Sequence, residues 1–262
     1  MIVVSCDHYT EVGKPFFDLQ KKYMGWFQEP IYFVNESKEV SFDGVRVIHV
    51  GTDVNWSGKM LRALEQIPQK YVIFMLEDYF IGKEVLREHV YGAVRTMQAH
   101  GLRYYKITAI PDTKKKSDIA PYLSVIPSNL RYGVNLQAAI FEKTYLQQVV
   151  SGPDRSAWET ETDLLKQVTD GYEYDLPGCV LDRRNIIDVH NGVIKGKWVR
   201  KTVRYFRRQG YDIDLGDRPV LPVGALAGFH FKAAVARMLP ASKVKGIKKV
   251  LKKFGMKFVS EN

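Results

Sequence analysis

The sequence predicts an α/β fold in which helices flank a mainly parallel sheet. Short, unbroken apolar runs of strand length alternate with longer segments that have helical spacing. Unbroken apolar runs indicate strands that are buried on both faces, which is typical of parallel sheets covered by helices. The 262 residues, of which 45% are hydrophobic and 26% charged, fit one compact domain with a small appendage.

The first half of the chain alternates strands and helices. Six apolar residues without a break, residues 71–76, form the clearest strand, and Pro68 ends the helix before it. Each apolar run leads directly into polar residues, which indicates where a buried strand leaves the core. The predicted strands are residues 2–5, 31–34, 45–50 and 71–76, and the predicted helices are residues 15–26 and 56–67.

The second half has weaker periodicity and a long loop at residues 111–130. The predicted helices are residues 84–100, 142–150, 157–169 and 196–209, and the predicted strands are residues 104–110, 135–141, 174–180 and 185–189. No internal repeat is present.

Charge divides the chain unevenly. Residues 1–194 hold 22 basic and 25 acidic residues, whereas residues 195–262 hold 17 basic and 4 acidic ones. We therefore expect a catalytic domain over residues 1–209, followed by a linker and a basic helical tail over residues 210–262. A near-neutral body disfavours a protein whose main partner is nucleic acid.

Several classes of protein are excluded by missing motifs. Two distant cysteines, Cys6 and Cys179, cannot staple a small secreted fold, and no Cys/His spacing is typical of zinc sites. The phosphate-binding loop of P-loop enzymes, the dinucleotide Gly-x-Gly-x-x-Gly and the serine-hydrolase elbow are all missing. The N-terminus does not resemble a signal peptide, so a cytoplasmic location is expected.

Polar residues follow four of the predicted strands, and the carboxyl ends of parallel strands meet at one edge of a sheet, where ligands bind. Glu77-Asp78 is the sharpest case, because adjacent carboxylates next to a core are costly unless solvated, paired or bound to a cation. A hard divalent ion shared with phosphate oxygens is one use. An ordinary polar strand end with a helix cap is the alternative.

Two further segments carry candidate chemistry. Glu159 and Glu161 lie at a predicted helix start beside Trp158, and either could act as a general base at a pocket edge or simply cap the helix. The stretch from His190 to Trp198 contains glycines with Lys195 and Lys197, which suits a flexible loop over phosphates. A surface turn with a structural histidine is the alternative there.

Taken in order, these segments resemble the glycosyltransferases of GT-A fold, and in particular bacterial enzymes of surface-polysaccharide clusters. The resemblance is carried by Ile2–Asp7, Leu76-Glu77-Asp78-Tyr79-Phe80, Ala157–Glu161 and Gly192–Trp198, and it covers roughly residues 1–200. It implies a Rossmann-like mixed sheet. It also implies that a nucleotide-sugar donor is held by Ser5, Asp7, Asn35, Asp53, Ser57, Glu77, Lys195 and Lys197.

The resemblance further implies that Asp78, with His190, holds Mg²⁺ or Mn²⁺. The acidic motif here is Glu-Asp-Tyr rather than the usual Asp-x-Asp, so a metal-independent variant stays open. Glu159, slightly favoured over Glu161, is expected to deprotonate an acceptor hydroxyl, which gives an inverting reaction; a retaining reaction stays open. A nucleotidyltransferase of similar sheet architecture and a basic nucleic-acid-binding protein are the alternatives.

The tail predicts a partner of another kind. Over residues 243–258, apolar residues recur at steps of three and four while lysines fill the remaining positions. Such a helix suits the interface of an anionic membrane, where each basic residue contributes about 1 kcal/mol. We therefore expect a peripheral protein on the inner face of the cell membrane that acts on a glycan or lipid-linked glycan and not on nucleic acid. Packing of the tail on the body is the alternative.

Overall fold

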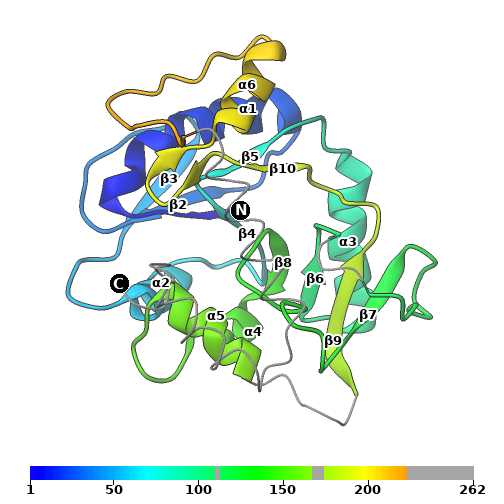
Figure 1. The fold of residues 1–262 in the computed structure, drawn as a ribbon. Coiled ribbons are helices and arrows are strands. Elements are labelled where there is room, and N and C mark those ends of the chain that lie inside the picture. The colour runs from blue at the N-terminus through cyan, green and yellow to red at the C-terminus, as the bar shows by residue number, and fades with distance from the viewer. Residues whose placement is uncertain (110–112, 167–173, 223–262) are drawn as a thin grey trace, which may run out of the picture.

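The computed structural model describes residues 1–109, 113–166 and 174–222, and its fold is mixed α/β, as the sequence predicts. A central sheet of eight strands runs through the molecule, with helices on both faces (Figure 1). The strand order is β3-β2-β1-β4-β8-β6-β9-β7. These strands are β1 (Ile2–Val4), β2 (Ile31–Asn35), β3 (Val45–His49), β4 (Tyr71–Leu76), β6 (Tyr104–Lys106), β7 (Leu123–Pro127), β8 (Ala139–Glu142) and β9 (Asp175–Asp182).

Parallel pairing dominates the half of the sheet that carries the candidate residues. Strands β3, β2, β1 and β4 are parallel to one another, and β6 is parallel to β9. The pairs β4–β8, β8–β6 and β9–β7 are antiparallel. The first strand lies directly beside β4, the strand that ends in Glu77-Asp78, so the polar residues after both strands meet at one edge of the sheet.

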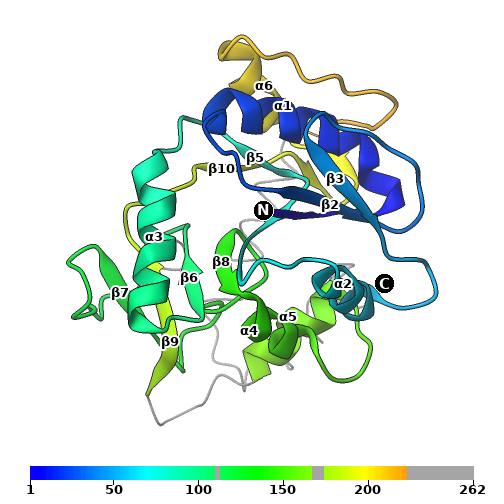
Figure 2. The same ribbon diagram turned by 180° about the vertical axis from the view of Figure 1, so that it is seen from behind.

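The two faces of the sheet bury separate apolar cores, which explains why the central strands are apolar throughout. Val3 and Met75 face one core, and Ile2 and Phe74 face the other. Helices α1, α3 and α6 cover the first face and α2 and α4 the second, with α5 beside them (Figure 2). The helices are α1 (Gly13–Met24), α2 (Trp56–Glu65), α3 (Arg87–His100), α4 (Lys143–Val150), α5 (Ala157–Lys166) and α6 (Arg200–Arg208), with a 3₁₀ helix η1 (Asp7–Val12) before α1.

Some elements differ from the sequence-based expectation. Strand β7 lies in the stretch predicted as a loop; it is an edge strand with irregular register that ends at Pro127, so its apolar signal is broken. The strand predicted at 185–189 is instead a turn region with Asn185 at φ 53°. Four short strands form two small sheets outside the central one: β5 (Tyr79–Ile81) with β10 (Val189–Asn191), and β11 (Val193–Ile194) with β12 (Lys197–Trp198).

The predicted C-terminal features fall largely beyond the part that the structure describes. The amphipathic segment 243–258 lies outside the described residues. Residues 211–222 are described and lie against the body, with Ile213 buried and Tyr211 donating a hydrogen bond from its hydroxyl to Asp18 on α1 at 2.7 Å. Within the described ranges, no helix has both the length and the apolar character needed to span a bilayer.

Candidate functional site

A cavity of about 330 Å³ opens at the carboxyl ends of β1 and β4. Three segments line it, and we call the loop after β1 and the β11–β12 hairpin its two walls and the end of β4 its floor. Its lining residues are Val4, Ser5, Cys6, Tyr9, Trp56, Leu76, Glu77, Asp78, Val193 and Lys195. The structure thus brings together three segments that the sequence singled out separately, and it places predicted residues Ser5, Glu77, Asp78 and Lys195 around one hollow.

Glu77 and Asp78 form the acidic floor of this cavity. Glu77 is 9% exposed, and neither carboxylate forms an ion pair with a residue in the described ranges. Burial, followed by the charge of Asp78, raises the pKa of Glu77 well above its usual range, and burial raises the pKa of Asp78 to about 7. The floor is therefore a site where a cation would relieve an unfavourable concentration of negative charge.

The predicted flexible loop at 192–198 is an ordered hairpin. Lys195 and Gly196 form its two-residue turn, with φ of 50° and 71°, as mirror-type hairpin turns require. The Gly192 amide donates to the Asp78 carbonyl at 2.6 Å, and a Cβ at Gly192 would lie 2.5 Å from the ring of Phe80. Lys195 lines the cavity, whereas Lys197 is exposed and is not among the lining residues.

Asp7 and Asn35, both predicted to hold the donor, instead hold each other and the loop after β2. The Asp7 carboxylate accepts hydrogen bonds from the Asn35 side chain and from the amides of Glu36, Ser37 and Lys38 at 3.0–3.1 Å. Burial opposes ionisation of Asp7, but the bonds from Ser37, Lys38 and Glu36 lower its pKa to about 2. Its oxygens are occupied by this loop, so the structure gives Asp7 a role in shaping the site.

Asp53 and Ser57 are also engaged away from the cavity. Asp53 forms a two-pronged ion pair with Arg62 at 2.6 and 2.7 Å, which lowers the pKa of Asp53 to about 2. The Ser57 hydroxyl accepts from the Arg155 amide at 2.8 Å and lies 3.3 Å from Asp154. Asp154 also accepts from the amides of Asn55 and Gly58, so it caps α2 from a distant loop.

Glu159 occupies the capping role that was the alternative reading of its segment. Its carboxylate accepts from the amide and hydroxyl of Ser156 at 2.9 and 2.7 Å, and the Glu159 amide donates back to the Ser156 hydroxyl at 3.2 Å. This reciprocal pair is a capping box at the start of α5. The preference for Glu159 over Glu161 as a base is therefore reversed by the geometry. Trp158, the residue before Glu159, is 52% exposed.

Glu161 faces inward from the same helix. One of its oxygens accepts from the Leu136 amide at 3.3 Å, and burial raises the pKa of its carboxyl. Burial and then the charges of Asp78, Glu161 and Glu77 raise the pKa of Tyr79. Tyr79 therefore lies within the fields of all three carboxylates, although neither Tyr79 nor Glu161 is among the residues that line the cavity.

A buried lysine lies near Glu161. Lys106 on β6 donates to the carbonyls of Tyr132 and Gly133 at 2.9 and 3.4 Å, and burial lowers its pKa to about 7 while Glu161 opposes that fall. Lys106 and Glu161 thus hold the same loop, residues 132–136, from two sides. Nothing in the sequence distinguished Lys106 from a surface lysine.

His190, predicted as a second metal ligand, is engaged elsewhere. Its ring stacks on Tyr205 of α6 at 4.1 Å between centroids, and its Nε2 lies 3.2 Å from the Asp188 carboxylate. A Cβ at Gly82 would lie 2.4 Å from this ring, so glycine there makes room for it. Among the residues that the structure describes, no three His, Cys, Asp or Glu side chains lie close enough to hold an ion by themselves.

The donor set that remains at the floor still suits a hard cation. Mg²⁺ is commonly held by one or two carboxylates together with substrate phosphates and water, without a full protein cage. Glu77, which is buried, and Asp78, which is half-buried, supply two adjacent carboxylates that line the cavity, so the residues present fit such an ion.

Sequence analysis missed some residues that shape the cavity. Tyr9 and Trp56 line it and come from the starts of η1 and α2. Arg218 lies just behind its wall, with its guanidinium over the ring of Tyr9 at 4.4 Å. A Trp opening a helix after a polar strand end was a usable signal for Trp56. No sequence signal identifies Arg218, because this residue reaches the site from the far end of the described chain.

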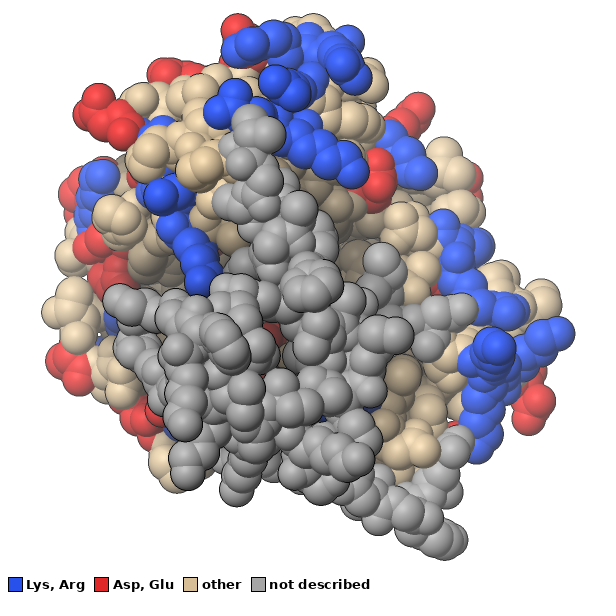
Figure 3. Space-filling model, viewed as in Figure 1, with Lys and Arg blue, Asp and Glu red and all other residues tan. Residues whose placement is uncertain are grey.

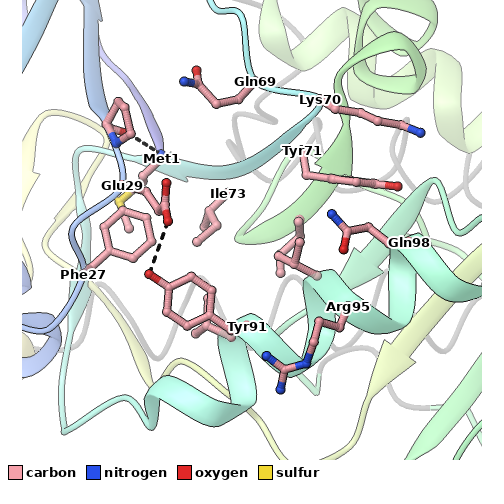
Figure 4. Close-up of a pocket in the computed structure, with 14 residues that line it drawn as sticks. Met1, Phe27, Glu29, Gln69, Lys70, Tyr71, Ile73, Tyr91, Arg95 and Gln98 are labelled. Carbon is pink, nitrogen blue, oxygen red and sulfur yellow. Dashed lines mark hydrogen bonds between the residues drawn. The ribbon is translucent and has the colours of Figure 1, made fainter.

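A larger cavity, of about 610 Å³, lies at the opposite end of the strands, between β4 and α3 (Figure 4). Its floor includes Ile73 and Val90, and Tyr91 donates a hydrogen bond to Glu29 at its rim, at 3.4 Å. None of the predicted site residues lines it.

No protein-family model matches the chain, and no curated protein matches its sequence. Solved structures with a similar arrangement include mannosyl-3-phosphoglycerate synthase from Rubrobacter xylanophilus, with 17% identity over 40% of this chain and a TM-score of 0.30. Others are residues 1–349 of S. aureus TarS, with 10% identity over 69% and a TM-score of 0.42, and a mycobacterial protein, with 13% identity over 40% and a TM-score of 0.29.

The chain spans only part of each of these proteins: 38% of the first, 59% of the second and 38% of the third. At TM-scores below 0.5, the overlaps carry no argument about what this chain does. A function for this chain is therefore inferred from the residues that line the cavity.

The acidic floor makes a prediction about stability and pH. Because the pKa of both carboxyls is raised by folding, the folded protein keeps protons that the unfolded chain loses above about pH 4. The free energy of unfolding should therefore fall as the pH rises from about 4 toward about 7, the raised pKa of Asp78. Asp78→Asn should flatten that fall in urea unfolding, whereas Glu65→Gln, an exposed control, should not. Parallel pH profiles for the wild type and Asp78→Asn would contradict the assignment.

Proposed function

We propose that the chain is a glycosyltransferase that moves a sugar from a nucleotide-sugar donor to an acceptor hydroxyl. One observation carries the proposal: a single cavity at the carboxyl ends of β1 and β4 gathers the loop after β1, the acidic pair Glu77-Asp78 and Lys195. In open α/β sheets this is the edge at which ligands bind. Its volume of about 330 Å³ lies at the small end of the range of ligand sites, roughly 300–1,000 Å³.

Different residues of the cavity would contact different parts of the donor. Trp56 and Tyr9 offer aromatic surfaces on which a nucleobase can stack. Lys195 places a cation on the wall opposite the β1 loop, where it would neutralise the diphosphate that leaves when the sugar is transferred. The Ser5 hydroxyl, bonded to the Cys6 carbonyl at 3.3 Å, is half-buried at the same wall and can hydrogen-bond the donor.

Glu77 and Asp78 would hold Mg²⁺ or Mn²⁺ together with the donor's phosphate oxygens. Bound there, the ion would stabilise the negative charge that develops on the departing diphosphate. His190 is not included in this set, because its ring packs on Tyr205 and its Nε2 faces Asp188.

Glu161 is proposed as the general base. Its carboxylate is half-buried, and burial raises its pKa, which suits a group that must accept a proton near neutral pH. Glu159 uses one carboxylate oxygen, Oε2, to accept both bonds from Ser156, and these bonds lower its pKa, so it is the weaker base. Direct attack by the deprotonated acceptor oxygen on the sugar carbon gives inversion.

The acceptor is proposed to be a polysaccharide or glycolipid, lipid-linked at the inner face of the cell membrane. The described part of the basic C-terminal quarter supports this location. Helix α6 buries Thr202, Val203 and Phe206 and turns Lys201, Arg204, Arg207 and Arg208 outward. Lys and Arg gather over this helix in Figure 3. The predicted amphipathic segment 243–258 would extend that basic surface.

A thermal-shift panel with UDP, GDP, CDP, ADP and dTDP, with and without Mn²⁺, tests the donor site. One nucleotide should raise the melting temperature of the wild type, and Mn²⁺ should increase that rise because the acidic floor holds it. Asp78→Asn should lose the Mn²⁺-dependent part, while His190→Phe should keep it. No response to any nucleotide would refute the proposed function.

The two glutamates of α5 provide a matched pair for the base. Glu161→Gln should lower kcat by about 10²–10⁴-fold with donor affinity unchanged, because the amide keeps the bond to Leu136 but cannot take a proton. Glu159→Gln should cost only helix stability. Sugar-transfer assays on both variants identify the base. An unchanged kcat in Glu161→Gln would rule Glu161 out.

Membrane contact can be measured by sedimentation with vesicles. The full chain should pellet with anionic vesicles and not with neutral ones, because the basic surface gains free energy only near negative headgroups. Removing residues 241–262 should reduce the pelleted fraction. Equal sedimentation with and without these residues would contradict the proposed role of the tail.

A further inference from the structure

Two walls of the cavity are joined by one buried side chain that comes from the end of the described chain. Arg218 Nη1 donates to the Gly196 carbonyl at 3.2 Å, in the turn of the hairpin, and Nη2 donates to the His8 carbonyl at 2.9 Å, in the loop after β1. Its Nε donates to Glu11 at 3.0 Å. The side chain is only 6% exposed.

The segment that carries Arg218 is itself attached to the hairpin. The Trp198 amide donates to the Pro219 carbonyl at 2.9 Å, and the Leu221 amide donates to the Trp198 carbonyl at 2.8 Å, so residues 219–221 extend the hairpin as a parallel bridge. The Trp198 indole donates to the Leu215 carbonyl at 2.9 Å. Residues 215–221, called the strap below, therefore fix the position of Arg218 from both sides.

Arg218 also acts on both residues that narrow the cavity. Its guanidinium lies over the Tyr9 ring at 4.4 Å, and Tyr9 lines one wall. Its bond to Gly196 holds the turn that presents Lys195 on the other wall. A Cβ at Gly196 would lie 3.7 Å from the Tyr9 hydroxyl, so the two walls approach closely at this point.

We propose that Arg218 is a positioning residue that sets the separation between the Lys195 turn and Tyr9, and so the width of the donor cavity. The functional part of this inference rests on the proposed donor site. Most N–H donors of the guanidinium are already used by Glu11, His8 and Gly196, so Arg218 acts through the walls rather than by gripping a phosphate. The planar fork is essential, because a lysine in its place carries the charge but cannot span three acceptors.

Two variants distinguish the effect of the positive charge of Arg218 from the effect of its planar guanidinium. Arg218→Gln removes both, and Arg218→Lys keeps only the charge. If Arg218 positions the walls, both variants should bind the stabilising nucleoside diphosphate about tenfold more weakly or worse, by isothermal titration. If it acts only as a nearby charge, Arg218→Lys should bind like the wild type, which would overturn the proposal. Arg208→Gln, an exposed arginine on α6, is the matched control and should not change binding.

A double-mutant cycle shows whether the effect passes through the hairpin. In a Lys195→Gln background, Arg218→Lys should change the nucleoside diphosphate affinity much less than in the wild type, because the group that it positions is already gone. Fully additive losses would overturn the proposal. Melting temperatures confirm that each variant is folded.

Hydrogen exchange tests the geometry without any ligand. Amides of residues 195–198 should exchange faster in Arg218→Lys than in the wild type, while those of β4 should not change. Unchanged exchange in the hairpin would overturn the proposal. If the hairpin loosens but the wild type binds no nucleoside diphosphate, the proposed function fails and the positioning of the walls still stands.

Discussion

Two adjacent carboxylates at the end of the most apolar strand impose the main constraint on this molecule. Glu77 and Asp78 leave the core where β4 ends, and burial raises the pKa of both. Such a pair is expensive unless positive charge comes near it. Arg218, behind the hairpin, is a cation whose charge favours the ionised form of Glu77. The hairpin, the strap and the loop after β1 are arranged around this need.

Acidic residues along this edge of the sheet divide into two groups with opposite behaviour. Asp7, Asp53 and Glu159 accept nearby hydrogen bonds or ion pairs that lower their pKa, so they stay charged and organise loops and helix starts. Glu77 is buried and Asp78 and Glu161 are half-buried, and burial raises the pKa of all three. Perturbed carboxyls in a cleft are the ones available for proton transfer and cation binding. The division separates residues that build the site from residues that would act in it.

The fold class could be predicted from the sequence, but the partners of the individual acidic residues could not. The fold class and the clustering of strand ends followed from apolar runs, because buried parallel strands leave a strong pattern. The partners of each polar residue did not follow, because they come from elsewhere in the chain. Ser57 meets Arg155, Asp53 meets Arg62, and Glu159 differs from Glu161 only in which way α5 turns it. Strand β7 and the hairpin were missed because an edge strand and two-residue strands carry too little periodicity.

The pairing of β1 with β4 also has a consequence for how the protein folds. Val4 lies beside Leu76, and Arg218 bonds His8 across 210 residues, so the cavity is completed by one of the contacts most distant in sequence among those described. Contacts of this kind form late, because closing long loops costs entropy before the contacts repay it. A chain still lacking its last described segment would hold its sheet but not its finished cavity. Ligand binding at this edge would thus report completed folding of the whole described body, and the acidic floor would stay open to solvent until then.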